Sequence, residues 1–158
     1  MYVMLLCGLL FSPQTDEQKQ LNKQVTEFAR KFYLAYENGD VDVVLGMAVV
    51  PWYQDGKAII RSQDELKVEL KKFLDQRDTS SGKRVPDIKL VAGFGAMKDR
   101  TAPKDRELLE QVARDDDYLA LVMLKPAEST KNNKSENVVL LVRLKDGKAY
   151  AIGVKHTP

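Results

Sequence analysis

Residues 26–44, TEFARKFYLAYENGDVDVV, contain the most regular apolar pattern of the chain and a signal for where a helix ends. In and before this stretch the apolar residues recur three or four positions apart, as in a helix with one buried face. They are Leu21, Val25, Phe28, Phe32 and Ala35 or Tyr36. Asn38-Gly39 favours the left-handed backbone in which helices end. We therefore predict a helix over 16–38, capped by Thr15 or Asp16.

The next segment predicts a short helix, a hairpin and a third helix. The short helix covers 40–47, and Pro51 forbids its continuation. Residues 51–60, PWYQDGKAII, place Asp55-Gly56 between two apolar runs, which indicates a tight hairpin because both turn residues need positive φ. Residues 62–65, SQDE, form a capping box that opens a helix to about residue 76.

The second half of the chain is predicted to be mainly strand. Alternating side chains indicate strands over 85–97, 137–145 and 148–155, with a second tight turn at Asp146-Gly147. Residues 118–124 are apolar on both faces, as expected of a covered central strand. The residues expected on the inner faces are Ile88, Leu90, Ala92, Phe94, Val138, Leu140, Val142, Leu144, Tyr150, Ile152, Val154 and His156. The glycines near residue 94 suggest a bulge or a curved sheet. In the charged stretch 99–117, Pro103 can start a further helix.

This order of elements resembles that of the nuclear transport factor 2-like (NTF2-like) superfamily, with its SnoaL-like and ketosteroid isomerase-like members, from about Asp16 to His156. The matching features are an aromatic-rich first helix that ends in ENGD, the hairpin 51–60 and the capped helix after it. The resemblance implies an α+β fold, a cone in which N-terminal helices pack on a curved, mainly antiparallel sheet around a cavity. The stretch 99–117 departs from that pattern, and we expect it to cover the cavity mouth.

The N-terminal segment bears on domain organisation and compartment. Residues 1–11, MYVMLLCGLLF, are almost wholly apolar, and a run of about ten such residues matches a signal-peptide core but does not span a bilayer. No basic residue precedes the run and no small-residue cleavage signal follows it. We favour an export signal over 1–14, to the periplasm or the cell exterior, with an apolar tail on a cytoplasmic protein as the alternative. Residues 15–158 are predicted to form one domain.

The composition argues against several classes of function. The 158 residues carry a formal net charge of +2 without a strongly basic stretch, so we do not expect nucleic-acid binding. Cys7 is the only cysteine and His156 the only histidine, which excludes an intramolecular disulfide and argues against a zinc site. We expect no cofactor and no metal. Residues 115–117, DDD, lack the ligand spacing of a calcium loop and are predicted to be exposed.

The candidate site residues are the groups expected inside or beside the cavity. Enzymes of the superfamily use carboxylates or His-Asp pairs there, because burial shifts their pKa values. The predicted inner faces contain no carboxyl group, and we interpret Asp55-Gly56 as turn residues only. His156 is either a base or hydrogen-bond donor in the cavity or an exposed residue at the chain end. An aromatic surface would suit a flat apolar ligand, with core packing as the alternative. The candidates are Tyr33, Tyr36, Trp52, Tyr53 and His156.

Three functions are consistent with this reading. The first, which we favour, is a noncatalytic homodimeric domain that binds a small apolar ligand or a protein partner. The second is a cyclase- or isomerase-type enzyme that uses an Asp or His156 on a hydrophobic substrate. The third is a structural dimerisation or assembly module, for which an apolar patch on the outer face of the sheet would be the sign. The fold alone does not decide among them, because the superfamily contains enzymes, transport adaptors and association domains.

Overall fold

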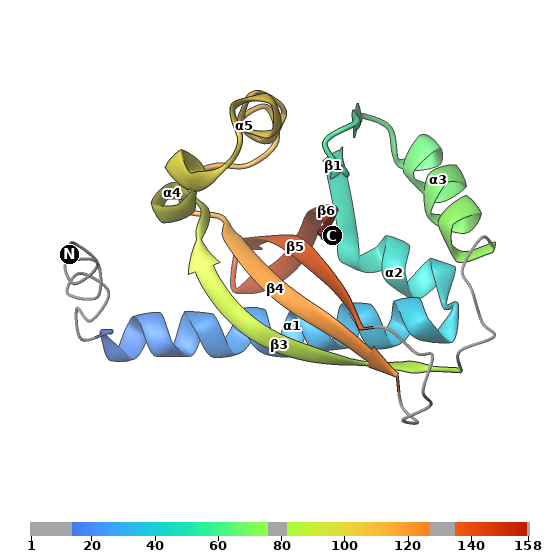
Figure 1. The fold of residues 1–158 in the computed structure, drawn as a ribbon, viewed down its shortest axis with the longest axis horizontal. Helices are drawn as coiled ribbons and strands as arrows, with labels where there is room; N and C mark the ends of the chain where they lie inside the picture. Colours follow the sequence, from blue (N-terminus) through green and yellow to red (C-terminus); the bar gives the residue numbers. More distant parts are fainter. Residues whose placement is uncertain (1–13, 76–81, 127–134, 158) are drawn as a thin grey trace, which may run out of the picture.

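A curved six-stranded sheet forms the centre of the computed structural model, which describes residues 14–75, 82–126 and 135–157 (Figure 1). The strands lie in the order β2-β1-β6-β5-β4-β3. β1 and β6 are parallel and every other neighbouring pair is antiparallel. The bounds are β1 (Ala48–Gln54), β2 (Ala58–Ile60), β3 (Arg84–Gly93), β4 (Tyr118–Pro126), β5 (Glu136–Lys145) and β6 (Lys148–Thr157). The expected α+β architecture with a mainly antiparallel sheet is therefore confirmed.

Three helices precede most of the sheet: α1 (Asp16–Asn38), α2 (Val41–Met47) and α3 (Gln63–Asp75). Their ends follow the predicted chemistry. Thr15 accepts a hydrogen bond from the backbone of Gln18 at 3.2 Å, and Gly39 ends α1 with φ 79°. Ser62 accepts from the backbone of Glu65 at 3.2 Å, as in a capping box. Asp40 occupies the cap position of α2 without a side-chain hydrogen bond.

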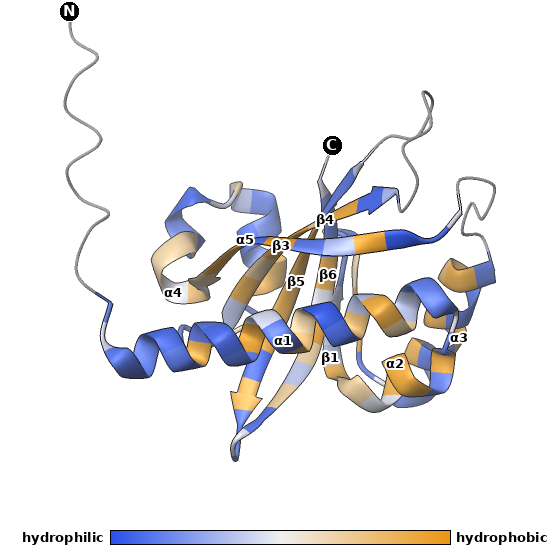
Figure 2. Cartoon of the chain, turned by 90° about the horizontal axis from the view of Figure 1, so that it is seen from below, coloured by the Kyte–Doolittle hydropathy of each residue, from blue (hydrophilic) through white to orange (hydrophobic). Residues whose placement is uncertain are grey.

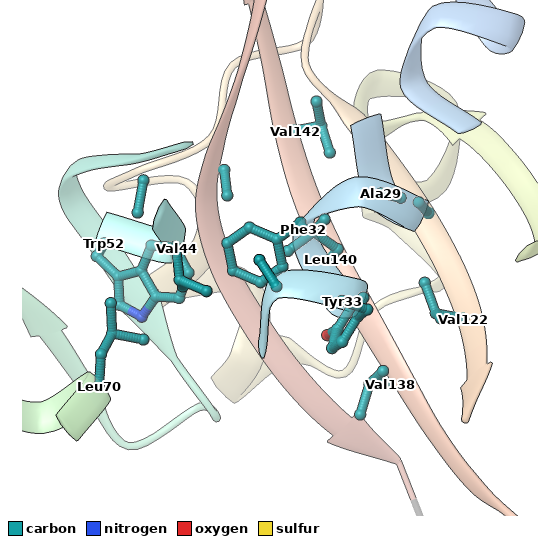
Figure 3. Packing of buried hydrophobic residues seen from close by; sticks show 14 of the residues in the cluster. Ala29, Phe32, Tyr33, Val44, Trp52, Leu70, Val122, Val138, Leu140 and Val142 are labelled. Carbon is teal, nitrogen blue, oxygen red and sulfur yellow. The ribbon is translucent and has the colours of Figure 1, made fainter. Parts of the chain in front are cut away.

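The two faces of the sheet carry separate apolar clusters. We call the face against α1 the inner face. Figure 2 shows α1 crossing the strands, and Figure 3 shows Phe32 of α1 packed between Trp52 and Leu140. The outer face carries a smaller cluster in which Tyr53, Leu141 and Ile152 contact residues that follow β3.

The segment between β3 and β4 supplies the cover of that outer cluster. It contains α4 (Phe94–Met97), a short 3₁₀ helix η1 (Lys98–Arg100) and α5 (Pro103–Leu109), which begins at Pro103 as predicted. Its buried apolar residues are Phe94, Leu109, Val112 and Ala113. The expectation that this segment covers the cavity mouth is wrong, because these residues pack on the outer face, away from α1.

Two β-bulges change which side chains face inward. The register of β3 against β4 shifts between Ile88 and Leu90, so Val91 joins the inner cluster while Leu90 is exposed. The register of β5 against β6 shifts between Leu141 and Val142, so Ile152 joins the outer cluster while Val154 packs inward. The predicted inner positions of Leu90, Ala92, Phe94, Tyr150 and Ile152 are therefore wrong; Tyr150 lies between the inward-facing Ala149 and Ala151, opposite Arg143. A bulge adds one residue to one strand and reverses the alternation beyond it.

The acidic run 115–117 is only partly exposed. Asp117 is 2% exposed, accepts a backbone hydrogen bond from Arg114 at 2.8 Å and forms an ion pair with Arg143 at 2.6 Å. The predicted exposure of Asp117 is therefore wrong, because α5 and its flanking residues bury the pair. The N-terminal apolar segment, with Cys7, lies outside the described residues. Among the described helices, none has the length and apolarity needed to cross a membrane.

Candidate functional site

A small cavity lies on the inner face between α1, α3 and the sheet. Its lining consists of Phe32, Tyr33, Tyr36, Trp52, Gln54, Leu70, Phe73, Val154 and His156. Aromatic and aliphatic side chains form most of this surface, and Gln54 and His156 add polar atoms to it. The volume open to the centre of a water-sized molecule is about 20 Å³, which is room for about one water. In this conformation the cavity is therefore nearly filled by its own side chains.

His156 is held by Asp55 at one edge of the cavity. Nδ1 of His156 lies 2.9 Å from both carboxylate oxygens of Asp55. The backbone N–H of His156 donates to Oδ1 of the same residue at 2.7 Å. The His156 side chain is 38% exposed and that of Asp55 only 13%. Because an ionised carboxylate only accepts hydrogen bonds, Nδ1 carries the proton and Nε2 is left for another partner.

A second set of charges lies on the other side of the imidazole. Nε2 of His156 is 3.5 Å from a carboxylate oxygen of Glu136, and Glu136 forms an ion pair with Arg84. Arg84 also pairs with Glu37 of α1 at 2.7 Å, and Glu37 is buried. The guanidinium of Arg84 is partly buried, which lowers its pKa, but the hydrogen bonds and charges of Glu37 and Glu136 outweigh this effect and raise the pKa of Arg84. The imidazole thus lies between Asp55 and Glu136.

The tyrosine and tryptophan side chains of the cavity are closely packed. Burial raises the pKa of Tyr33 well above its ordinary value, and the charges of Tyr36, Glu136 and Asp55 add to this effect. Tyr33 therefore stays protonated at any physiological pH. The indole N–H of Trp52 donates to Gln54 at 2.8 Å, which satisfies the one polar atom of the indole inside the core.

Phe73 covers the imidazole from the side of α3. The two ring centroids are 6.5 Å apart and the planes are inclined by 22°. Phe73 lies near the end of α3 and is partly exposed, whereas its neighbours Leu70 and Leu74 are buried. Among the lining side chains, Phe73 is therefore the one whose displacement would enlarge the cavity at the least cost in core packing.

The arrangement supplies groups for hydrogen bonding and for proton transfer. An imidazole oriented by a carboxylate can donate or accept at Nε2, and a base of this kind must lie within hydrogen-bond reach of the atom it serves. In the described part of the chain, no group of three or more His, Cys, Asp and Glu side chains is arranged to hold a metal ion.

The structure brings together four of the five predicted site residues and separates the fifth. Tyr33, Tyr36, Trp52 and His156 all line the cavity. Tyr53 points to the outer face and packs in the cluster under α5. His156 is not at a frayed end, because β6 continues to Thr157 and pairs with β5 there.

Sequence reasoning missed the charged partners of the site. Asp55 was interpreted only as a turn residue, yet it binds His156 across 101 positions of sequence. Arg84, Glu37 and Glu136 also escaped notice, since no local pattern relates them. The one available signal was the hairpin itself, which projects Asp55 from the end of β1 beside the parallel strand β6.

A wider groove lies at the other end of α1, and it does not combine aromatic side chains with an oriented polar group as the cavity beside His156 does. Its volume is about 460 Å³, and polar side chains of α1 face Asp115 and Asp116 across it. Asp115 is already paired with Lys98 at 2.9 Å. No buried polar group without a partner, among the described residues, points into it.

Comparison with known proteins identifies the architecture. No protein-family model and no curated protein sequence matches the chain. Among solved structures, a cystatin-like fold protein of unknown function from Nostoc punctiforme is 17% identical, with a TM-score of 0.54, over 90% of this chain and 91% of that one. An NTF2-like protein of unknown function from Pseudomonas putida is 10% identical, with a TM-score of 0.54, over 88% of this chain and 87% of that one. A Catenulispora acidiphila protein in complex with S-DNPA is 15% identical, with a TM-score of 0.52, over 88% and 95% of the two chains. At these identities the likeness concerns the fold alone, and over nearly its whole length the chain has the NTF2-like, or cystatin-like, fold.

Proposed function

We propose that the chain is a binding domain for a small, flat, largely apolar molecule that carries one polar group. The observation that carries this proposal is the convergence of Tyr33, Tyr36, Trp52 and Phe73 on a single oriented imidazole, that of His156. Binding sites for small molecules combine mostly apolar surfaces with a few placed polar groups. The apolar part of the ligand would contact the aromatic rings, and its polar group would meet Nε2 of His156.

Binding requires the cavity to open, since its present volume holds about one water. Displacement of the Phe73 ring from the imidazole would expose both the aromatic floor and Nε2. The complex of the Catenulispora acidiphila protein with S-DNPA supports the use of this fold for binding a ligand.

Two single-copy residues make the proposal directly testable. The chain has one tryptophan, Trp52, and one histidine, His156, so the indole N–H signal and the imidazole Nε2 signal can each be assigned to one residue in ¹H–¹⁵N spectra. p-Cresol and toluene share a flat ring, and only p-cresol has a hydroxyl group. We expect p-cresol to shift both signals in a saturable way with one dissociation constant. It should bind about fivefold tighter than toluene, since a hydrogen bond contributes about 1 kcal/mol.

Two variants separate the contribution of the polar contact from nonspecific hydrophobic binding. His156→Phe keeps an aromatic ring under Phe73 and should remove the preference for p-cresol. Leu34→Ala changes a residue that is 43% exposed on α1, next to Tyr33, and should leave both affinities unchanged. If neither probe shifts the Trp52 indole signal in a saturable way, the cavity is not a binding site.

A second function, proton transfer, is favoured by the geometry of the His156–Asp55 pair. Neutral His156 held at Nδ1 presents Nε2 as a general base, a role worth about 10²- to 10⁴-fold in rate. The generic probe is 5-nitrobenzisoxazole. A base removes its C3 proton, the electron pair forms the nitrile, and the N–O bond breaks to release a phenolate. Catalysis that His156→Gln abolishes and Asp55→Asn lowers would support an enzyme of isomerase or cyclase type. Equal rates for wild type and His156→Gln would exclude a catalytic base at this position.

We also propose that two chains associate through the part of the outer face that α5 leaves open. Leu90 and Val85 of β3 are each 51% exposed there, beside the partly buried Leu121 and Met123. Asp87 and Lys125 lie across β3 and β4 from one another on the same face. A two-fold contact would set opposite charges of the two copies against each other around the apolar residues. If the chain dimerises but neither p-cresol nor toluene binds the cavity, these results would support a structural dimerisation module rather than a ligand-binding domain.

A further inference from the structure

α5 contacts the outer face of the sheet at the point where the inner face carries His156. The side chain of Asp105, in the first turn of α5, is 19% exposed and forms an ion pair with Lys155 of β6. Lys155 directly precedes His156, and the two side chains point to opposite faces of the strand.

The same carboxylate also lies against the β1–β2 turn. A Cβ atom built on Gly56 would come within 2.5 Å of Oδ1 of Asp105, so the turn and the carboxylate are in direct contact. Gly56 directly follows Asp55, the partner of His156. Asp105 therefore contacts the chain neighbour of each member of the His156–Asp55 pair.

Backbone hydrogen bonds join these two segments. Asp55 donates its N–H to the carbonyl of Val154 at 2.9 Å, and His156 donates its N–H to the Asp55 side chain at 2.7 Å. The β1–β2 turn and the end of β6 are thus connected on one side by these bonds and on the other by Asp105. Tyr53 closes the contact, because its buried hydroxyl lies beside Gly56, and burial together with the nearby Asp105 carboxylate raises the pKa of this hydroxyl.

We propose that Asp105 is a positioning residue, which fixes the β1–β2 turn against β6 from the outer face and so holds Asp55 and Nδ1 of His156 in register. Without the carboxylate, the Lys155 ammonium group has no described partner, and the Asp55-Gly56 turn loses its contact with α5. The importance of this role rests on the proposed function, since it matters only if His156 serves the cavity. The contact itself is independent of any ligand.

The test reads the protonation state of one side chain in the protein without ligand. His156 is the only histidine, so the ¹⁵N resonances of Nδ1 and Nε2 are unambiguous in uniformly labelled protein. In wild type at a pH where the ring is neutral, we expect the protonated-type shift at Nδ1 and the unprotonated-type shift at Nε2. In Asp105→Asn the two shifts should approach each other by at least half of their separation, because the tautomers interchange once the hydrogen bond to Asp55 loosens. Asp55→Gly, which removes the acceptor at a residue with φ 52°, sets the limit of complete loss.

Two further variants keep the result interpretable. Asp99→Asn removes another carboxylate of the same segment, one that pairs with Arg106, and should leave the His156 shifts as in wild type. Lys155→Met removes the ion pair from its other end and should act as Asp105→Asn does, which preserves the test if Asp105→Asn fails to fold. Unchanged nitrogen shifts in a folded Asp105→Asn or Lys155→Met protein would overturn the inference. A changed tautomer together with no p-cresol binding would retain the positioning role and reject the proposed ligand site.

Discussion

At the scale of single residues, Gly56 shows how one missing side chain permits a contact between distant segments. Gly56 and Gly147 occupy equivalent places in two Asp-Gly turns, with φ of 68° and 72°. A Cβ on Gly147 meets no heavy atom within 4 Å, whereas a Cβ on Gly56 meets Asp105 at 2.5 Å. A side chain at either position would therefore meet the same backbone strain, but only at Gly56 would it also meet Asp105 and, at 3.3 Å, the hydroxyl of Tyr53.

This pair predicts a difference in stability between two alanine variants. Gly147→Ala should lower the free energy of unfolding by about 1 kcal/mol, the usual cost of a positive φ at a residue with a side chain. Gly56→Ala should cost at least about 1 kcal/mol more, because Asp105 must also move. Urea unfolding measures both values, and in an Asp105→Ala background most of the excess at Gly56 should disappear, because only the 3.3 Å contact with the Tyr53 hydroxyl remains. An equal loss in the free energy of unfolding for the two variants would show that Asp105 moves aside without an energetic penalty.

Tyr53 gives a prediction for alkaline pH. Burial, followed by the charges of Asp105 and Asp55, raises the pKa of Tyr53 from 10.0 to about 12 in the folded protein. The resulting stability is fully present below pH 10 and is lost as the pH rises to about 12, because the unfolded chain releases the proton first. Across that interval the wild type should lose roughly 2 to 3 kcal/mol more than Tyr53→Phe. Unfolding by urea at pH 9 and at successive values up to 11.5 measures the difference. Parallel losses in the two proteins would mean that Tyr53 ionises as readily as in the unfolded chain.

At the scale of elements, local patterns predicted the structure wherever one segment decides its own conformation. The ends of α1 and α3, both Asp-Gly turns and the start of α5 at Pro103 follow from residues within a few positions. The bulges in β3 and β6 do not, because they arise from pairing with neighbouring strands. The same limit applies to the site: four lining residues came from helix and strand faces, but Asp55 needed the parallel pairing of β1 with β6.

The attachment of the α4–α5 segment depends on a buried ion pair at the start of β4. Asp117 binds Arg143 and the backbone of Arg114, and its carbonyl accepts from Phe94 at 2.7 Å. Asp117→Ala leaves the Arg143 guanidinium, itself 15% exposed, without this partner and should cost about 3 to 5 kcal/mol. Asp116→Ala, at the exposed neighbour, should change stability by less than about 0.5 kcal/mol. Comparable unfolding midpoints in urea for the two variants would be inconsistent with a structural role of the pair.

At the scale of the whole molecule, helices cover the inner face of the sheet but leave part of its outer face exposed. The inner face is covered by the first three helices, while α4, α5 and the residues that flank them cover only the part of the outer face that carries Tyr53, Leu119, Leu141 and Ile152. The remaining outer surface presents apolar side chains from β3 and β4 beside Asp87, Lys89 and Lys125. Exposed apolar residues framed by charges are the usual composition of a protein interface.

This asymmetry predicts how a single charge alters assembly. Leu90→Lys places an ammonium group at the centre of the proposed two-fold contact, where the same ammonium group of the second copy would face it, and should raise the dimer dissociation constant at least tenfold. Val68→Lys makes the same change at a residue that is 64% exposed on α3, away from the sheet, and should leave the constant as in wild type. Sedimentation velocity over a concentration series gives all three constants. Identical sedimentation of wild type and Leu90→Lys would place any self-association on another surface, and α5 would then cover the outer face only to hold the β1–β2 turn and β6 together.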